Sequence, residues 1–198
     1  MKDLKDLKGL NLGFAMCGSF CTFSKALVLM QELVSLGINV FPIMSYNAYE
    51  TSTRFGEASD IHLKIEAITN KTIIHTLVDA EPLGPKSLID AMLIAPCTGN
   101  TLAKMSNGIS DSPVLLAAKS LLRNGKPIVL ALATNDGLSG SLKNIGHLLE
   151  KKNIYFVPLG QDDVVNKPYS LVASLPLAIE TLALALDGEQ KQPILIKY

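Results

Sequence analysis

The chain has 198 residues, of which 48% are apolar and 18% are charged, and this composition is typical of a globular protein rather than of a disordered chain or a fibrous repeat. Eighteen Lys and Arg balance eighteen Asp and Glu, so the formal net charge is zero. Without a broad positive field, the chain is not expected to bind nucleic acid or an anionic membrane. Small molecules and other proteins are the expected partners.

The cysteines and the amino terminus both indicate a protein of the reducing cytoplasm. Cys17, Cys21 and Cys97 are odd in number and scattered, which predicts neither a disulfide framework nor a zinc site, and no other metal site is expected. Cys97 is expected to be a small packing residue. The segment 1–11 mixes acids and bases without an apolar centre, and the longest apolar runs are too short to span a bilayer. We therefore expect no export signal and no membrane anchor.

Five apolar runs of strand length recur along the chain, with a shorter one near 72–75. Because these runs are continuously apolar, we expect strands that are buried on both faces, as in a parallel sheet. They cover 11–16, 38–44, 91–95, 127–133 and 154–157.

Stretches with helical periodicity lie between these runs, at 23–36, 57–69, 112–123 and 140–152. Strand followed by helix, repeated, predicts an α/β fold with a doubly wound, Rossmann-like parallel sheet in three layers. No repeat or linker divides the chain, so we expect one domain over 1–198. Residues 76–90, with three Pro and Gly positions at 82, 84 and 85, are predicted to form a loop before the third of these strands.

The last apolar stretch, 170–187, predicts a helix that begins or kinks near Pro176. Its leucines fall on more than one face, and a helix that is apolar all round is normally buried. We therefore expect it to pack on the sheet or on another copy of the chain, in a homo-oligomer.

Hydroxyl residues follow the first strand, where a helix begins. Gly18, Ser19 and Thr22 are typical of a phosphate site at a helix amino end, although Ser and Thr there are also ordinary helix caps. A P-loop is rejected, because Ser19 and Phe20 stand where the Lys and the hydroxyl residue would be, and no GxGxxG motif is present.

Further hydroxyl and amide side chains follow the other strands. They are Ser45, then Pro96, Thr98, Gly99, Asn100 and Thr101, and finally Ala133, Thr134 and Asn135. Because the carboxyl ends of parallel strands form one ligand crevice, this set suits a planar heterocycle with imide groups. The alternative is that these are turn and cap residues.

The stretch IAPCTGNTLAKMSNGISDSP at 94–113 resembles the signature of the homo-oligomeric flavin-containing cysteine decarboxylases, the family of phosphopantothenoylcysteine decarboxylase. Residues 18–19, 45 and 133–135 match positions where that family holds flavin mononucleotide (FMN). A closer resemblance, through nearly the whole chain, is to the B subunits of dipicolinate synthases. It is carried by TRFGEA at 53–58, DAEPLGPK at 79–86, IAPCTGN at 94–100, DSPVLLAAK at 111–119 and FVPLGQDD at 156–163.

This resemblance implies a flavoprotein-type fold and an oxidoreductase subunit that helps to oxidise dihydrodipicolinate to dipicolinate (pyridine-2,6-dicarboxylate) during sporulation, in the mother-cell cytoplasm of a spore-forming bacterium. It also implies FMN, or phosphate alone, on this chain, NADP on the partner A subunit, and a homo-oligomer that is a trimer or a multiple of one.

Two departures from the decarboxylase pattern are clear. Residues 82–85 read PLGP where that family has a catalytic His, and residues 132–135 read LATN in place of PxMN. An FMN-dependent decarboxylase of a small carboxylate and a non-catalytic partner subunit that binds phosphate or flavin remain as alternatives.

Three further residues are candidates for chemistry. His75 follows a β-branched run and is a weak candidate for acid–base catalysis, with a surface role as the alternative. His62, within a helical stretch, is expected to face solvent. Arg54 and Lys86 are the candidates for binding the carboxylates of the substrate, and the alternative for Arg54 is a solvated charge or an ion pair.

Overall fold

The computed structural model describes residues 7–197, and a seven-stranded sheet lies at its centre. Its four long strands are parallel and neighbour one another in the order β2-β1-β3-β4. They are β1 (Asn11–Met16), β2 (Asn39–Met44), β3 (Ala91–Cys97) and β4 (Ile128–Thr134). This arrangement confirms the predicted doubly wound α/β fold.

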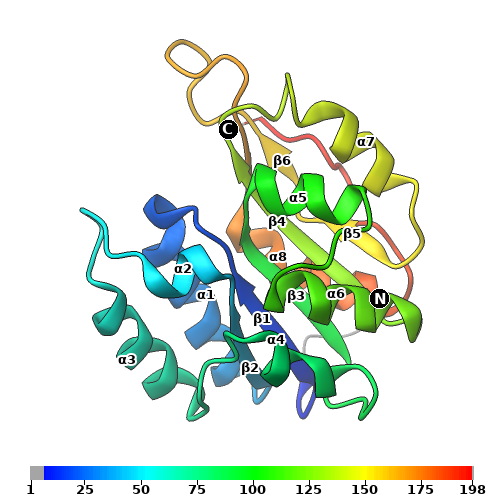
Figure 1. Cartoon of the computed structure of the whole chain (residues 1–198). Helices are drawn as coiled ribbons and strands as arrows, with labels where there is room; N and C mark the ends of the chain where they lie inside the picture. Colours follow the sequence, from blue (N-terminus) through cyan, green and yellow to red (C-terminus); the bar gives the residue numbers. More distant parts are fainter. Residues whose placement is uncertain (1–6, 198) are drawn as a thin grey trace.

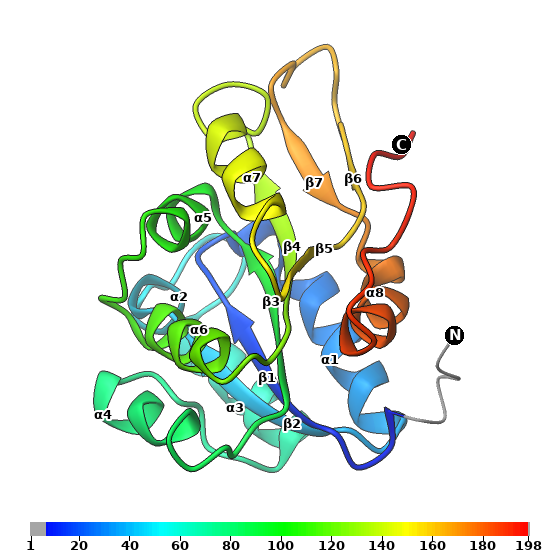
Figure 2. The same ribbon diagram turned by 90° about the vertical axis from the view of Figure 1, so that its right-hand side faces the viewer.

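The outer edge of β4 is shared by two different neighbours. β5 (Ile154–Phe156) pairs in parallel with the first half of β4, whereas β7 (Leu171–Ala173) pairs antiparallel with its end, at Ala133 and Thr134. β6 (Leu159–Gly160) pairs antiparallel with β7, so the two form a hairpin that extends beyond the body of the molecule (Figure 2).

Of the two alternatives predicted for 170–187, a helix start near Pro176 is confirmed, and the residues before Pro176 are not helical. Residues 171–173 form β7, η4 (Leu175–Leu177) follows as a 3-10 turn, and only Ala178–Leu186 form helix α8. The physical reason is Pro176, which fits the first turn of a helix but not its interior, so the chain remains free to pair with β4 before it.

Helices cover both faces of the sheet, as Figures 1 and 2 show. One face carries α1 (Phe23–Ser35) and α8, and the other carries α5 (Gly99–Ser106), α6 (Pro113–Arg123) and α7 (Leu142–Leu149). The remaining helical elements are η2 (Phe20–Thr22), α2 (Tyr46–Glu50), α3 (Ala58–Thr69), α4 (Leu77–Ala80) and η3 (Glu81–Leu83).

The core follows directly from the apolar strands. Every residue of β3 is buried, and so are the last five residues of β1 and the first five of β4. α6 presents Val114, Leu121 and neighbouring apolar side chains to this sheet at helical spacing. Burial at roughly 25 cal/mol per Å² of apolar surface makes these strands the rigid base from which their carboxyl ends project.

The apolar helix α8 is covered within the chain itself. Ala178, Leu182 and Ala185 are buried, and the helix packs on β4 and β5. Its composition therefore does not by itself require a second copy, and the homo-oligomer stays a prediction.

Among residues 7–197, no helix combines the length and apolarity that a membrane crossing requires. Residues 1–6, part of the segment in which no export signal was expected, lie outside the described residues.

Candidate functional site

The carboxyl ends of β2, β1, β3 and β4 meet at one edge of the sheet, and two cavities open there. We name the first, of about 380 Å³, the Lys104 cavity; its wall comprises Gly18, Ser45, Tyr46, Asn47, Thr98, Asn100, Thr101, Lys104, Ser112 and Leu115. The second, of about 640 Å³, is the hairpin cavity, with Ser19, Cys21, Thr22, Lys25, Ala133, Thr134, Asn135, Asp162, Lys167, Val172, Ala173, Ser174, Leu175 and Pro176. Both volumes lie within the range of about 300–1,000 Å³ that is typical of small-molecule sites.

The residues predicted to bind the cofactor are divided between the two cavities. Five of them line the Lys104 cavity: Gly18, Ser45, Thr98, Asn100 and Thr101. Five others line the hairpin cavity: Ser19, Thr22, Ala133, Thr134 and Asn135. Neighbouring residues 18 and 19 line different cavities, so the loop after β1 borders both.

Pro96 and Gly99, the two other predicted cofactor residues, line neither cavity. Pro96 is buried in β3, and its carbonyl oxygen accepts a hydrogen bond of 3.1 Å from the backbone N–H of Cys17. This bond ties the loop after β1 to β3, so Pro96 positions the loop without bordering the cavities.

Helix capping separates the hydroxyl residues into two groups. Ser45 accepts a hydrogen bond from Ala48 N at the start of α2, and Thr98 accepts one from Thr101 N at the start of α5. Ser19 and Thr22 occupy the cap positions of η2 and α1 but make no such side-chain bond. Their hydroxyls instead lie 3.2 Å from each other. The cap alternative thus holds for Ser45 and Thr98 and fails for Ser19 and Thr22.

An Asp136 cluster holds the loop after β4 against the start of α5. Asp136 Oδ1 accepts hydrogen bonds from Thr134 Oγ1 at 2.5 Å and from Ser141 Oγ at 2.9 Å. A Cβ atom added to Gly99 would lie 2.8 Å from Thr134 Oγ1, 3.0 Å from Ser141 Oγ and 3.1 Å from Asp136 Oδ1. Gly99 is therefore required by this close approach.

Two buried thiols lie beneath the site. Burial raises the pKa of the Cys17 thiol to about 11, although the Thr101 hydroxyl and the Thr98 backbone lower it by hydrogen bonding. Burial also raises the pKa of the Cys97 thiol well above its ordinary value, and Cys17 nearby adds to this effect. Both thiols stay protonated at neutral pH, so neither is a nucleophile. The packing role predicted for Cys97 is confirmed.

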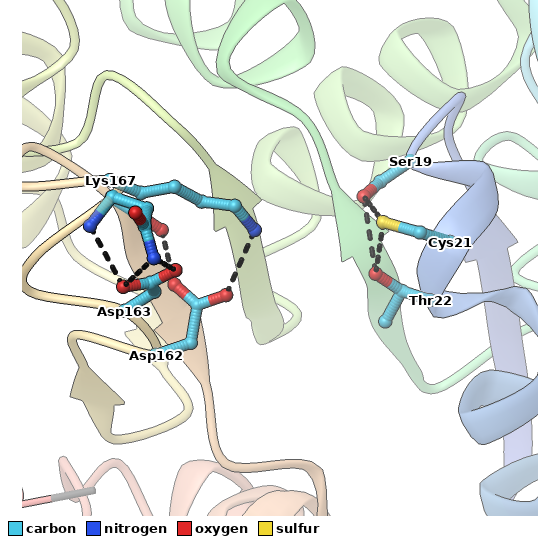
Figure 3. Close-up of polar contacts among 8 residues, drawn as sticks. Ser19, Cys21, Thr22, Asp162, Asp163 and Lys167 are labelled. Carbon is cyan, nitrogen blue, oxygen red and sulfur yellow. Dashed lines mark hydrogen bonds and ion pairs between the residues drawn. The ribbon is translucent and has the colours of Figure 1, made fainter.

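The hairpin turn is ordered by its own polar contacts (Figure 3). Ser170 Oγ donates to Asp162 Oδ1 at 2.6 Å, and Lys167 Nζ lies 3.4 Å from Asp162 Oδ2. The Ser170 hydrogen bond, helped by the charge of Lys167, holds the pKa of the Asp162 carboxyl below its ordinary value. Hydrogen bonds from the backbone N–H and the side chain of Asn166 do the same for the pKa of Asp163.

His75 lines neither cavity. Its ring stacks on Tyr49 at 3.8 Å between centroids, and His62 stacks on Tyr49 at 4.0 Å. The expectation that His62 faces solvent is wrong, because this stack leaves it half-buried. The stack fixes α2, which carries Tyr46 and Asn47 into the Lys104 cavity.

Arg54 and Lys86 also line neither cavity. Arg54 is exposed in the turn after α2, with its guanidinium 4.9 Å from the centroid of the Phe55 ring. Lys86 is exposed in the turn after η3. Their roles in substrate binding stay predictions without a contact to the site.

The sequence-based candidates omit several residues that border the cavities. Tyr46 and Asn47 line the first, and Lys25 and Lys167 line the second. The Lys104 ammonium, one turn into α5, lies 2.7 Å from Asp111 Oδ2. Within residues 7–197, no three His, Cys, Asp or Glu side chains gather as a metal site would require.

Comparison with known proteins places these features in a family. The family model described as Flavoprotein matches residues 2–168. The B subunit of dipicolinate synthase from Bacillus subtilis (strain 168) is 45% identical over 194 residues, which cover 98% of this chain and 97% of the relative.

Two solved structures are similar as well. The crystal structure of the dipicolinate synthase B subunit from Bacillus halodurans C has 47% identity and a TM-score of 0.89, covering 97% of this chain and 99% of the other. The FMN-dependent cysteine decarboxylase SpaF, at 21% identity, has a TM-score of 0.68 over 91% of this chain and 99% of the other, and this likeness concerns the fold alone.

The capping analysis predicts which hydroxyl groups stabilise the fold. Ser45→Ala and Thr98→Ala should each lower the free energy of unfolding by about 0.5–2 kcal/mol, because each removes a helix cap. Ser19→Ala and Thr22→Ala should change it by less than about 0.5 kcal/mol. Urea unfolding of the four variants checks this, and equal losses in all four would contradict the division.

The close approach at Gly99 gives a second prediction. Gly99→Ala should destabilise the protein by about 1–3 kcal/mol, since the new methyl group meets three oxygen atoms. Gly146 in α7 is the matched control, because a Cβ there meets nothing within 4 Å. Gly146→Ala should raise stability by about 0.4–1 kcal/mol, and thermal unfolding that ranks the two variants the other way would refute the packing argument.

Proposed function

We propose that this chain, which belongs to the Flavoprotein family, is the FMN-binding B subunit of a dipicolinate synthase. In this function it works with a partner A subunit that uses NADP to oxidise dihydrodipicolinate to dipicolinate in a spore-forming bacterium. The 45% identity over 98% of the chain supports the assignment. The observation that carries it is the gathering of five predicted cofactor residues around the Lys104 cavity.

The Lys104 cavity has the features that FMN requires. A Cβ atom on Gly18 would meet nothing closer than 3.5 Å, and the φ angle of this residue is not left-handed, so the fold itself does not require glycine there. A ligand that approaches the backbone closely does require it. Asn47 and Asn100 are exposed in the same wall, and their amides offer both donors and acceptors.

The phosphate of FMN belongs in the Lys104 cavity, because Lys104 is the cation of that wall and the hydroxyls of Ser45 and Ser112 border it. The ion pair with Asp111 leaves Lys104 half-buried rather than fully enclosed, so its ammonium can shift toward a phosphate. The flavin ring would then lie toward Thr134 and Asn135. This differs from the sequence-based expectation of a phosphate at Ser19 and Thr22.

FMN, when bound, supplies a two-electron acceptor for the two hydrogen atoms that the dihydropyridine ring loses. The residues of this chain bind and orient it. Thr134 is held by Asp136, which turns its hydroxyl hydrogen away from the cavity and leaves its oxygen as an acceptor. Asn135, exposed next to it, offers the amide that the ring edge needs.

Decarboxylation has less support. Residues 82–85, PLGP, stand where related decarboxylases carry a catalytic His, and Leu83 and Gly84 among them are buried. A Cβ on Gly84 would lie 2.3 Å from Ser120 Cβ in α6, so this segment is packed against a helix with no room for a larger side chain. No acid–base group replaces the His within residues 82–85.

Lys104→Ala tests the phosphate position. The variant should bind FMN about 10-fold to 100-fold more weakly, because it loses a charge-assisted contact, while riboflavin, which lacks the phosphate, should bind as it does to the unaltered chain. Quenching of flavin fluorescence measures both affinities. Lys143→Ala on α7 is the control, and an unchanged FMN affinity in Lys104→Ala would place the phosphate elsewhere.

Single-turnover kinetics test the reaction. When the two subunits are combined without NADP, dihydrodipicolinate should bleach the visible absorbance of the flavin on this chain, and added NADP should restore it. If the isolated A subunit oxidises the substrate with NADP at the full rate and the flavin never bleaches, the redox role of this chain is refuted.

A further inference from the structure

The hairpin cavity has more charged side chains in its wall than the Lys104 cavity, whose wall contains Lys104 alone among charged residues. The wall of the hairpin cavity contains two cations, Lys25 and Lys167, and one carboxylate, Asp162. The two lysines come from different walls, because Lys25 is in the first turn of α1 and Lys167 is in the turn between β6 and β7. Figure 3 shows the start of α1 and the hairpin facing each other.

The side of the hairpin cavity that the start of α1 forms has a cation and two hydroxyl groups that could bind an anion. Lys25 lies three residues after Thr22, so the two side chains share one face of the helix. The hydroxyls of Ser19 and Thr22 cap no helix and border the same cavity. Within residues 7–197, no carboxylate lies within ion-pair distance of Lys25.

On the side of the cavity that the hairpin forms, Lys167 makes only a weak ion pair. Lys167 Nζ lies 3.4 Å from Asp162 Oδ2, whereas Asp162 Oδ1 accepts a shorter bond of 2.6 Å from the buried Ser170. Exposed ion pairs of this kind contribute little, so an incoming carboxylate can take Lys167 while Asp162 stays bonded to Ser170. Apolar side chains also line this cavity, from Val172 in β7 and from residues 175–176 in η4.

We infer that the hairpin cavity is a two-point site for a small planar dicarboxylate, in which Lys25 binds one carboxylate and Lys167 the other. The apolar surface of β7 and η4 would contact the ring between them, and Ser19 and Thr22 would donate to the first carboxylate. This inference rests on the proposed function for the class of ligand, but it assigns the substrate to Lys25 and Lys167 in place of Arg54 and Lys86.

Calorimetric titration of the full-length chain with pyridine-2,6-dicarboxylate and with pyridine-2-carboxylate tests the site. The unaltered chain should bind the dicarboxylate at least about tenfold more tightly than the monocarboxylate, because only the dicarboxylate reaches both lysines. Lys25→Ala and Lys167→Ala should each remove this preference, and Lys167→Arg should retain it. Lys64→Ala, an exposed lysine of α3, is the matched control.

Asp162→Asn should raise the affinity for the dicarboxylate, whereas the lysine variants should lower it. Without the competing carboxylate, Lys167 is free for the ligand, so the dicarboxylate should bind roughly two- to fivefold more tightly. A weaker affinity in this variant would contradict the exchange of partners by Lys167.

Two results would overturn the inference. One is a dicarboxylate affinity that neither lysine variant changes, and the other is no binding of the dicarboxylate to the chain, whether isolated or combined with its A subunit. FMN titration of the same preparations keeps the two proposals separate. If the chain binds no FMN but prefers the dicarboxylate, and if this preference depends on Lys25 and Lys167, the proposed FMN binding is refuted and the dicarboxylate site is supported.

Discussion

The close packing of Gly99 against the Asp136 cluster is the constraint on which both cavities depend. Gly99 follows Thr98, which lines the Lys104 cavity, and a Cβ atom added to Gly99 would lie 2.8 Å from Oγ1 of Thr134, which lines the hairpin cavity. Two hydrogen bonds from Thr134 and Ser141 hold the Asp136 carboxylate in place. A displacement of this contact moves one wall of each cavity, because the loops after β3 and β4 are joined there.

The hydrogen bond from Cys17 N to Pro96 O acts in the same way on the other side of β3. It joins the loop after β1 to the same strand, and that loop borders both cavities. β3, buried along its whole length, is thus the support for the loops on both sides. The site is made by short loops that a rigid strand positions, which is the common arrangement of binding residues in proteins.

The sequence predicted the long elements because their signals depend on many residues. The apolar runs of β1, β3 and β4 and the periodicity of α1 and α6 each extend over six or more residues. The two- and three-residue strands β6 and β7 carry no such signal. Helices α2 and α5 are short, and their start signals, Ser45 and Thr98, were interpreted as ligand-binding residues, although they also cap the helices.

The sequence predicted the site residues at the ends of the strands better than the lysines that a helix and the hairpin contribute. Ten predicted residues border the two cavities because the carboxyl ends of parallel strands must meet at one edge. Lys25 and Lys167 were not found this way, since the position of a Lys on a helix or a hairpin depends on how that element packs. Lys167 reaches the edge only because the hairpin pairs antiparallel with the end of β4. A chain with zero net charge can therefore still offer an anion two cations at one edge of its sheet.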